Sequence, residues 1–130
     1  HRQSSAASDV YKRQISNLQN IISKLDINFT SEKGFPIFFK KDDQLLNDQY
    51  FIQITKDNIE IKYNTYGGKL YGLISLVHLI DFYQTKLPIC TIHDNPKYQW
   101  RGMHLDCARQ FYTIDEIKRL FDYMVLFKLK

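Results

Sequence analysis

The chain lacks three features that would narrow its class at once: a long apolar run, a cysteine framework and an extreme charge. No stretch of about 18 apolar residues occurs, so the sequence offers no transmembrane helix. Its two cysteines, Cys90 and Cys107, match neither a metal-ligand spacing nor a disulfide framework, and both are expected to be free thiols. Hydrophobic residues at 44% and charged residues at 25% are the balance of a globular protein, which excludes wholesale disorder and collagen.

The net charge of +4 is modest, and half of it comes from one end of the chain. Within residues 1–14, Arg2, Lys12 and Arg13 outnumber Asp9. This stretch is small, polar and basic, with hardly an aliphatic residue, and it is expected to be a disordered or foreign leader outside the fold. The remainder is only mildly basic, so no nucleic-acid partner is expected.

Hydrophobic periodicity predicts the elements that follow the leader. Apolar residues spaced by three and four predict helices, and alternation of apolar with other residues predicts strands. Helices are expected at residues 15–25, 70–83 and 113–127. Strands are expected at residues 27–30, 36–39, 50–55, 59–63, 87–92 and 101–106, and those at 50–55 and 59–63 are expected to form an antiparallel hairpin with one buried face. The fold class is therefore α+β over residues 15–94, an antiparallel sheet with two helices, followed by a strand-helix unit within residues 95–130.

The start of the last helix is well marked. Thr113 and Glu116 fit a capping box, in which the two side chains satisfy free backbone amides reciprocally. This box explains the Asp115-Glu116 pair better than a catalytic role does, and no catalytic residue is assigned in this chain. Gly67-Gly68 also precedes a helix, but it fits neither GxGxxG nor GK[ST], so we interpret it as helix-entry geometry rather than as a phosphate-binding turn.

Arg109 is the candidate ligand-binding residue. It follows an apolar strand that stops at Asp106 and precedes a helix, which is where α/β barrels and open α/β sheets place ligand-binding groups. Its guanidinium carries five donors in a fixed fork, suited to adjacent sugar hydroxyls or a carboxylate. The alternative is an arginine bound to Asp106 only to hold the loop, and both interpretations hold if Asp106 orients Arg109.

Three neighbouring residues have plainer explanations. Arg101 starts the strand at the end opposite the usual barrel site, so a structural role is expected. His104 lies in the middle of the strand and is expected in the core or in an interface. Cys107 has no histidine in a recognisable arrangement with it, which argues against a nucleophile.

The order of residues near the end of the chain supports a more specific interpretation. Asp94-Asn95-Pro96-Lys97-Tyr98-Gln99-Trp100-Arg101-Gly102 is followed by Asp106-Cys107-Ala108-Arg109-Gln110-Phe111. This arrangement resembles the junction of the family 20 glycoside hydrolases, the β-N-acetylhexosaminidases, where an α+β accessory domain meets a (β/α)8 barrel. Upstream, residues 47–50 and 67–73 also look like that accessory domain. The resemblance implies an accessory domain at 15–94 and a truncated barrel at 95–130.

The resemblance implies an enzymatic activity whose catalytic residues are not among those of this chain. The family hydrolyses terminal non-reducing β-linked N-acetylhexosamine residues of glycans with retention, by attack of the substrate's own acetamido oxygen. Arg109 matches the family arginine that binds sugar hydroxyls, and Asp106 looks like its local support. No cofactor is implied. The family's catalytic Asp-Glu pair belongs to a later barrel strand, so the isolated chain is expected to be inactive.

Three further expectations follow. The family implies a secreted, periplasmic or lysosome-like compartment. A lone strand-helix unit cannot close a barrel, so its apolar faces are expected to be uncovered. Gln110, where the family often has histidine or another polar residue, leaves the fine specificity open. The alternative function is a stand-alone carbohydrate- or protein-binding module, with residues 15–94 as its working part.

Overall fold

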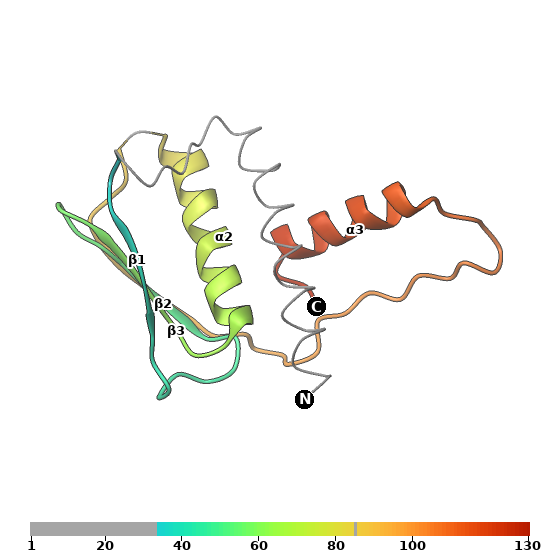
Figure 1. Ribbon diagram of the computed structural model, residues 1–130, viewed down its shortest axis with the longest axis horizontal. Coiled ribbons are helices and arrows are strands. Elements are labelled where there is room, and N and C mark those ends of the chain that lie inside the picture. Colours follow the sequence, from blue (N-terminus) through green and yellow to red (C-terminus); the bar gives the residue numbers. More distant parts are fainter. Residues whose placement is uncertain (1–33, 85) are drawn as a thin grey trace. The chain divides into compact units, whose positions relative to one another are not determined.

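The computed structural model describes residues 34–84 and 86–130, which belong to two compact units, one ending at Lys97 and one running from Tyr98 to Lys130 (Figure 1). The predicted leader, the helix at 15–25 and the strand at 27–30 lie outside the described residues. The elements are β1 (Ile37–Lys41), β2 (Tyr50–Ile54), β3 (Ile59–Tyr63), α2 (Tyr66–Tyr83), β4 (Cys90–Asp94) and α3 (Ile114–Leu126).

The predicted hairpin is confirmed in position and direction. Strands β2 and β3 pair antiparallel from Tyr50 opposite Tyr63 to Ile54 opposite Ile59. Thr55 closes the turn, because its amide donates to the Asn58 carbonyl at 2.9 Å. The alternation of apolar with other residues predicted these strands because successive side chains of a strand point to opposite faces of the sheet.

The prediction of a wholly antiparallel sheet is wrong. The strand order is β1-β3-β2-β4, and β1 runs parallel to β3 while the other two pairs are antiparallel. The sheet is therefore mixed. Alternation reveals which face a side chain occupies, but it carries no information about the neighbouring strand or its direction. Strand β4 also starts three residues later than predicted, beyond Pro88, whose nitrogen cannot donate to a ladder.

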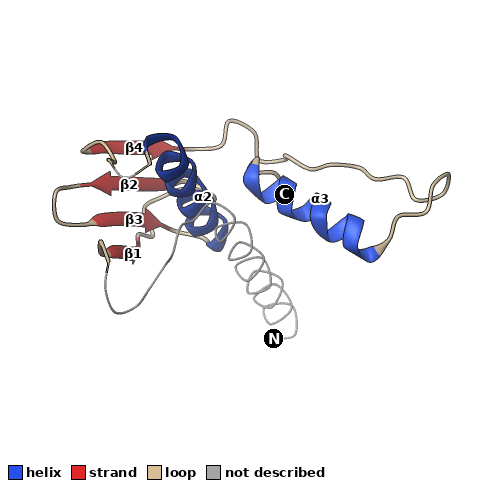
Figure 2. Ribbon diagram, turned by 90° about the horizontal axis from the view of Figure 1, so that it is seen from above, coloured by secondary structure: helices blue, strands red, loops and turns tan. Residues whose placement is uncertain are grey.

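Helix α2 covers one face of the sheet (Figure 2). Its buried side chains meet the inward residues of the central strands, and the core residues exposed by 3% or less are Tyr50, Ile52, Ile54, Ile59, Ile61, Ile74, Leu76 and Val77. The helix starts at Tyr66, four residues before the predicted start, because Thr65 caps it by accepting from the Gly68 amide at 3.3 Å. Within the described part of the chain, no helix is long and apolar enough to cross a membrane.

The glycines of α2 allow the helix to approach the sheet closely. Gly67 and Gly68 lie in the first turn and are buried. A Cβ added at Gly68 would overlap the Gln49 carbonyl oxygen, and one added at Gly72 would come within 2.8 Å of Ile61 Cγ2. The structure confirms the interpretation of Gly67-Gly68 as helix-entry geometry.

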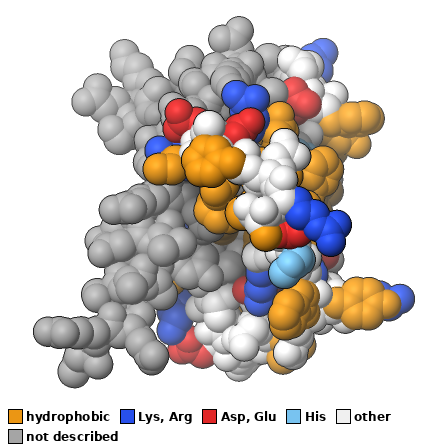
Figure 3. Space-filling model, turned by 90° about the vertical axis from the view of Figure 1, so that its right-hand side faces the viewer, with side chains coloured by type: hydrophobic (Ala, Val, Ile, Leu, Met, Phe, Trp, Pro, Cys, Tyr) orange, Lys and Arg blue, Asp and Glu red, His pale blue; other side chains and the backbone are white. Residues whose placement is uncertain are grey.

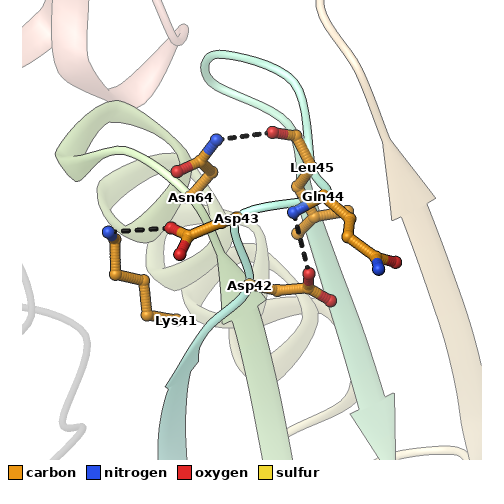
Figure 4. Close-up of polar contacts among 6 residues, drawn as sticks. All are labelled: Lys41, Asp42, Asp43, Gln44, Leu45 and Asn64. Atoms are coloured by element: carbon orange, nitrogen blue, oxygen red, sulfur yellow. Dashed lines mark hydrogen bonds and ion pairs between the residues drawn. The ribbon is translucent and has the colours of Figure 1, made fainter.

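The loop between β1 and β2 is held by short polar contacts (Figure 4). Lys41 Nζ lies 2.8 Å from Asp43 Oδ1, with both side chains largely exposed. The hydrogen bond to Asp43 raises the pKa of Lys41. The Asn64 side chain donates to the Leu45 carbonyl at 2.6 Å. The charges form a solvated cluster, as expected for a surface loop.

A buried tyrosine hydroxyl connects three elements of the first unit. Tyr50 is 2% exposed, and its Oη lies 2.6 Å from Ser75 Oγ of α2. The same hydroxyl donates to the carboxylate of Asp94 at the end of β4. Tyr50 therefore fixes the end of β4, at the point where the chain leaves the sheet.

The second unit contains α3, whose capping box is confirmed. Thr113 Oγ1 accepts from the Glu116 amide at 3.3 Å, and Glu116 Oε2 accepts from the Thr113 amide at 2.7 Å. The strand predicted at 101–106 is absent, and this stretch is irregular. A strand is defined by a ladder to a neighbour, whereas this stretch is joined to the end of the chain by a backbone bond from the Lys130 amide to the Arg101 carbonyl at 2.9 Å.

Candidate functional site

The loop that carries Arg109 is shaped by Asp106. One oxygen of this carboxylate, Oδ1, accepts from the Ala108 amide at 2.8 Å, which is the Asx turn that aspartate favours. The other oxygen lies 4.0 Å from Arg109 Nε. Asp106 thus contacts the loop backbone and the arginine at once, and the structure brings the two predicted site residues together.

The contact between Asp106 and Arg109 leaves the arginine accessible. The Arg109 side chain is 94% exposed and that of Asp106 is 53% exposed. An ion pair this open and this long contributes little to stability, about 0–1 kcal/mol. The shorter bond to the Ala108 amide is therefore the main structural function of Asp106. Most of the guanidinium donors face solvent, where a ligand could accept from them.

The acidic pair that follows this loop, Asp115-Glu116, lies in the first turn of α3. The hydrogen bond from the Thr113 backbone lowers the pKa of Glu116. A general acid at neutral pH needs the opposite shift, a raised carboxyl pKa. Asp115 Oδ1 lies 3.7 Å from Lys118 Nζ, one helical turn away. The structure supports the interpretation of Asp115-Glu116 as a cap.

The other residues singled out in the motif are mostly exposed. His104 is exposed, which contradicts the core alternative and leaves the interface alternative as a prediction; without a strand at 101–106, no sheet face buries it. Cys107 is an exposed free thiol and Cys90 is a half-buried one. Arg101 is half-buried, and its carbonyl accepts the bond from Lys130. In the described ranges, no cluster of three His, Cys, Asp or Glu side chains is suited to a metal ion.

The bond between Lys130 and Arg101 shows how the second unit is connected. The chain leaves Arg101, forms the loop with Arg109, returns through α3 and brings its last amide to the Arg101 carbonyl. A strand, a helix and a return beside the first strand is the path of a β-α-β unit. The bond from the Lys130 amide to the Arg101 carbonyl is of the kind that such a path forms.

Large apolar side chains are exposed throughout the second unit, as the sequence predicted. Trp100 is 86% exposed and Phe111 is 85% exposed. Other exposed apolar residues of this unit are Tyr98, Met103, Ile114, Phe121, Tyr123 and Phe127. Hydrophobic side chains stand out on the molecular face shown in Figure 3. Monomeric proteins rarely expose so many large apolar side chains together.

Two arrangements in the first unit were missed by the sequence interpretation. One is the Tyr50 hydroxyl bonded to Asp94, which joins residues 44 positions apart. The other is a contact row on the open face of the sheet, where Lys62, Phe51 and His93 touch across β3, β2 and β4. The sequence predicted the two strands but not their register, and the structure supplies both the pairing of Phe51 with Lys62 and the position of β4.

Comparison with known proteins finds similarity to one family of glycoside hydrolases. Residues 98–130, which include Arg109, match the model of the catalytic domain of glycosyl hydrolase family 20. The chain is 29% identical over 115 residues to beta-hexosaminidase B of Pseudoalteromonas piscicida, covering 88% of this chain and 15% of the relative. It is 44% identical over 79 residues to a chitooligosaccharidolytic beta-N-acetylglucosaminidase of Bombyx mori, covering 57% of this chain and 13% of the relative.

A solved structure agrees with the sequence matches. The family 20 exo beta-N-acetylglucosaminidase of Vibrio harveyi superposes with a TM-score of 0.74 at 25% identity, over 90% of this chain and 19% of that one. The fold and the motif are similar to those of glycoside hydrolases of this family. By these matches the chain is similar to a fragment of a family 20 glycosyl hydrolase. It spans about one seventh of the length of the first of these relatives.

Proposed function

We propose that the chain comprises the accessory domain and the first strand-helix unit of a β-N-acetylhexosaminidase, with the boundary near residues 94–95. The observation that carries the proposal is the family match over residues 98–130, the range that holds Arg109. The backbone bond from Lys130 to Arg101 supports it, since a β-α-β path brings those segments together.

The complete protein would remove terminal β-linked N-acetylhexosamine from glycans with retention. In this proposal the acetamido oxygen of the substrate attacks the anomeric carbon, and an Asp-Glu pair beyond this chain orients the acetamido group and moves the proton. Arg109 binds adjacent hydroxyls of the non-reducing sugar with its guanidinium fork. Asp106 supports Arg109 through the turn that it forms with Ala108.

A comparison of arginine variants in the complete reading frame tests this role. Each charge-assisted hydrogen bond contributes about 1.5–3 kcal/mol, so Arg109→Ala should lower kcat/KM on a chromogenic N-acetylglucosaminide roughly 100-fold or more. Arg109→Lys should recover little, because lysine keeps the charge but not the fork. Arg119→Ala, at an exposed position of α3, is the matched control and should behave as wild type.

The 130-residue chain by itself should show no turnover of the same substrate. Its adjacent acidic pair, Asp115-Glu116, is held in the helix cap. Turnover by the purified chain would contradict the assignment of the catalytic pair to residues beyond it. Unchanged kinetics of Arg109→Ala in the complete protein would contradict the sugar-binding role.

A further inference from the structure

The sheet face opposite α2 carries an ordered row of side chains. The strand register places Lys40, Lys62, Phe51 and His93 next to one another across β1, β3, β2 and β4. Helix α2 packs on the other face, against the buried isoleucines (Figures 1 and 2). No described helix covers this row.

The middle of the row is held by its own contacts. Lys62 Nζ lies 5.2 Å from the centroid of the Phe51 ring, a cation-π distance, and 3.5 Å from Glu60 Oε1. The ring of His93 meets Phe51 edge-on, with centroids 4.3 Å apart and planes at 78°. The Lys62 side chain is 31% exposed, so its ammonium is both positioned and reachable.

Lys40 adds a second positive charge directly opposite Lys62. It is exposed, and the part of the chain that the structure describes gives it no carboxylate partner. Like charges opposite each other on neighbouring strands are destabilising. Folding therefore does not account for this pair, whereas an anionic group between the two ammonium groups would remove the repulsion. Glu60 already balances Lys62, so the uncompensated charge lies at Lys40.

The next row supplies the remaining groups of a sugar site. Phe38 is 54% exposed and lies opposite Glu60, which is in turn opposite Gln53. The face thus combines an exposed aromatic ring with amide and carboxylate groups that can bond hydroxyls. A sugar unit that bears a carboxylate has matching parts: an apolar ring face, hydroxyls and one negative charge.

We propose that this open sheet face is a binding surface for an acidic polysaccharide, with a uronic-acid carboxylate accepted between Lys40 and Lys62. The choice of a glycan over an acidic peptide rests on the proposed function of the protein. The surface lies within the first unit and uses none of the residues of the Arg109 loop. It is a second carbohydrate contact, separate from the proposed hydrolytic site.

Affinity electrophoresis of the 130-residue chain tests the surface without any turnover. The probe is polygalacturonate, and the matched comparison is its methyl ester, which keeps the sugar rings and removes the charge. Lys40→Gln removes one ammonium, and Lys86→Gln removes the same charge from an exposed loop position as the control. Far-UV circular dichroism and thermal unfolding establish that each variant is folded.

We expect polygalacturonate to retard the chain and its ester to do so much less. Exposed ion pairs are worth up to about 1 kcal/mol, so Lys40→Gln should weaken binding roughly two- to five-fold and Lys86→Gln should not. Binding should also fall between about 50 and 200 mM salt because exposed charges are screened.

Three results would overturn the proposal. They are no retardation at the lower salt concentration, equal losses for Lys40→Gln and Lys86→Gln, and equal binding of the methyl ester. Retardation by polyglutamate that is as strong and as dependent on Lys40 would assign the surface to an acidic protein instead. None of these outcomes depends on hydrolysis. They therefore do not test the proposed hexosaminidase function, which is tested separately by the kinetics of the Arg109 variants.

Discussion

Replacing Gly68 by alanine separates two opposite effects on stability. In an exposed helix, glycine to alanine stabilises by up to about 1 kcal/mol, because alanine loses less conformational entropy. At Gly68 an added Cβ would overlap the Gln49 carbonyl oxygen, which belongs to the backbone and cannot rotate away. The helix must then move off the sheet or the strand start must shift. Overpacking of this kind costs about 1–3 kcal/mol or more.

The expected net result is destabilisation by roughly 2 kcal/mol. For a domain of this size, 1 kcal/mol corresponds to a change in Tm of about 4–8 °C, so a fall of roughly 10 °C is expected. Gly72→Ala should cost less, because its nearest neighbour is a side-chain methyl of Ile61 at 2.8 Å, which can adjust. Gly34→Ala is the control, because nothing lies within 4 Å of its added Cβ.

Urea unfolding followed by far-UV circular dichroism measures the series. The three variants should have similar m values and differ in midpoint, with Gly68→Ala lowest, Gly72→Ala between and Gly34→Ala near wild type. If Gly68→Ala is as stable as wild type or more stable, helix propensity outweighs the contact. The close approach of α2 to residues 48–49 would then be wrong.

Four other predictions concern the remaining parts of the chain. Tyr50→Phe should lower stability by about 1–3 kcal/mol, measured by the same unfolding curves, since the Asp94 carboxylate loses a buried partner. Thr113→Ala should speed amide exchange in the first turn of α3; a rate equal to wild type would contradict the cap. The protection factor of the same turn, which is the intrinsic exchange rate divided by the observed rate, should fall in acid. The folded pKa of Glu116 is lowered, so its contribution is complete above the ordinary value of 4.5 and is lost as pH falls through the folded pKa. Limited proteolysis should cut within residues 101–130 before it cuts the sheet, and equal protection of the two would contradict the expectation of an uncovered apolar surface.

Features that depend on neighbouring residues in the chain could be predicted from the sequence. The hairpin at 50–63, a helix over most of α2 and the Thr113-Glu116 capping box were all predicted, because a strand alternation, a helical spacing and a cap are each set within a few residues. Arg109 and Asp106 were chosen as candidate site residues from their motif. The structure adds the turn by which Asp106 shapes the loop, and the sugar-binding role remains a proposal.

Features that depend on distant residues were decided by the tertiary structure. The parallel pairing of β1 with β3 and the start of β4 at Cys90 follow from which strands become neighbours. The absence of a strand at 101–106 has the same origin, since a ladder needs a partner. The bond of Tyr50 to Asp94 and the row on the open sheet face also join residues far apart in the chain. Local patterns specify elements and faces, whereas strand order arises only when several elements bury their apolar faces together.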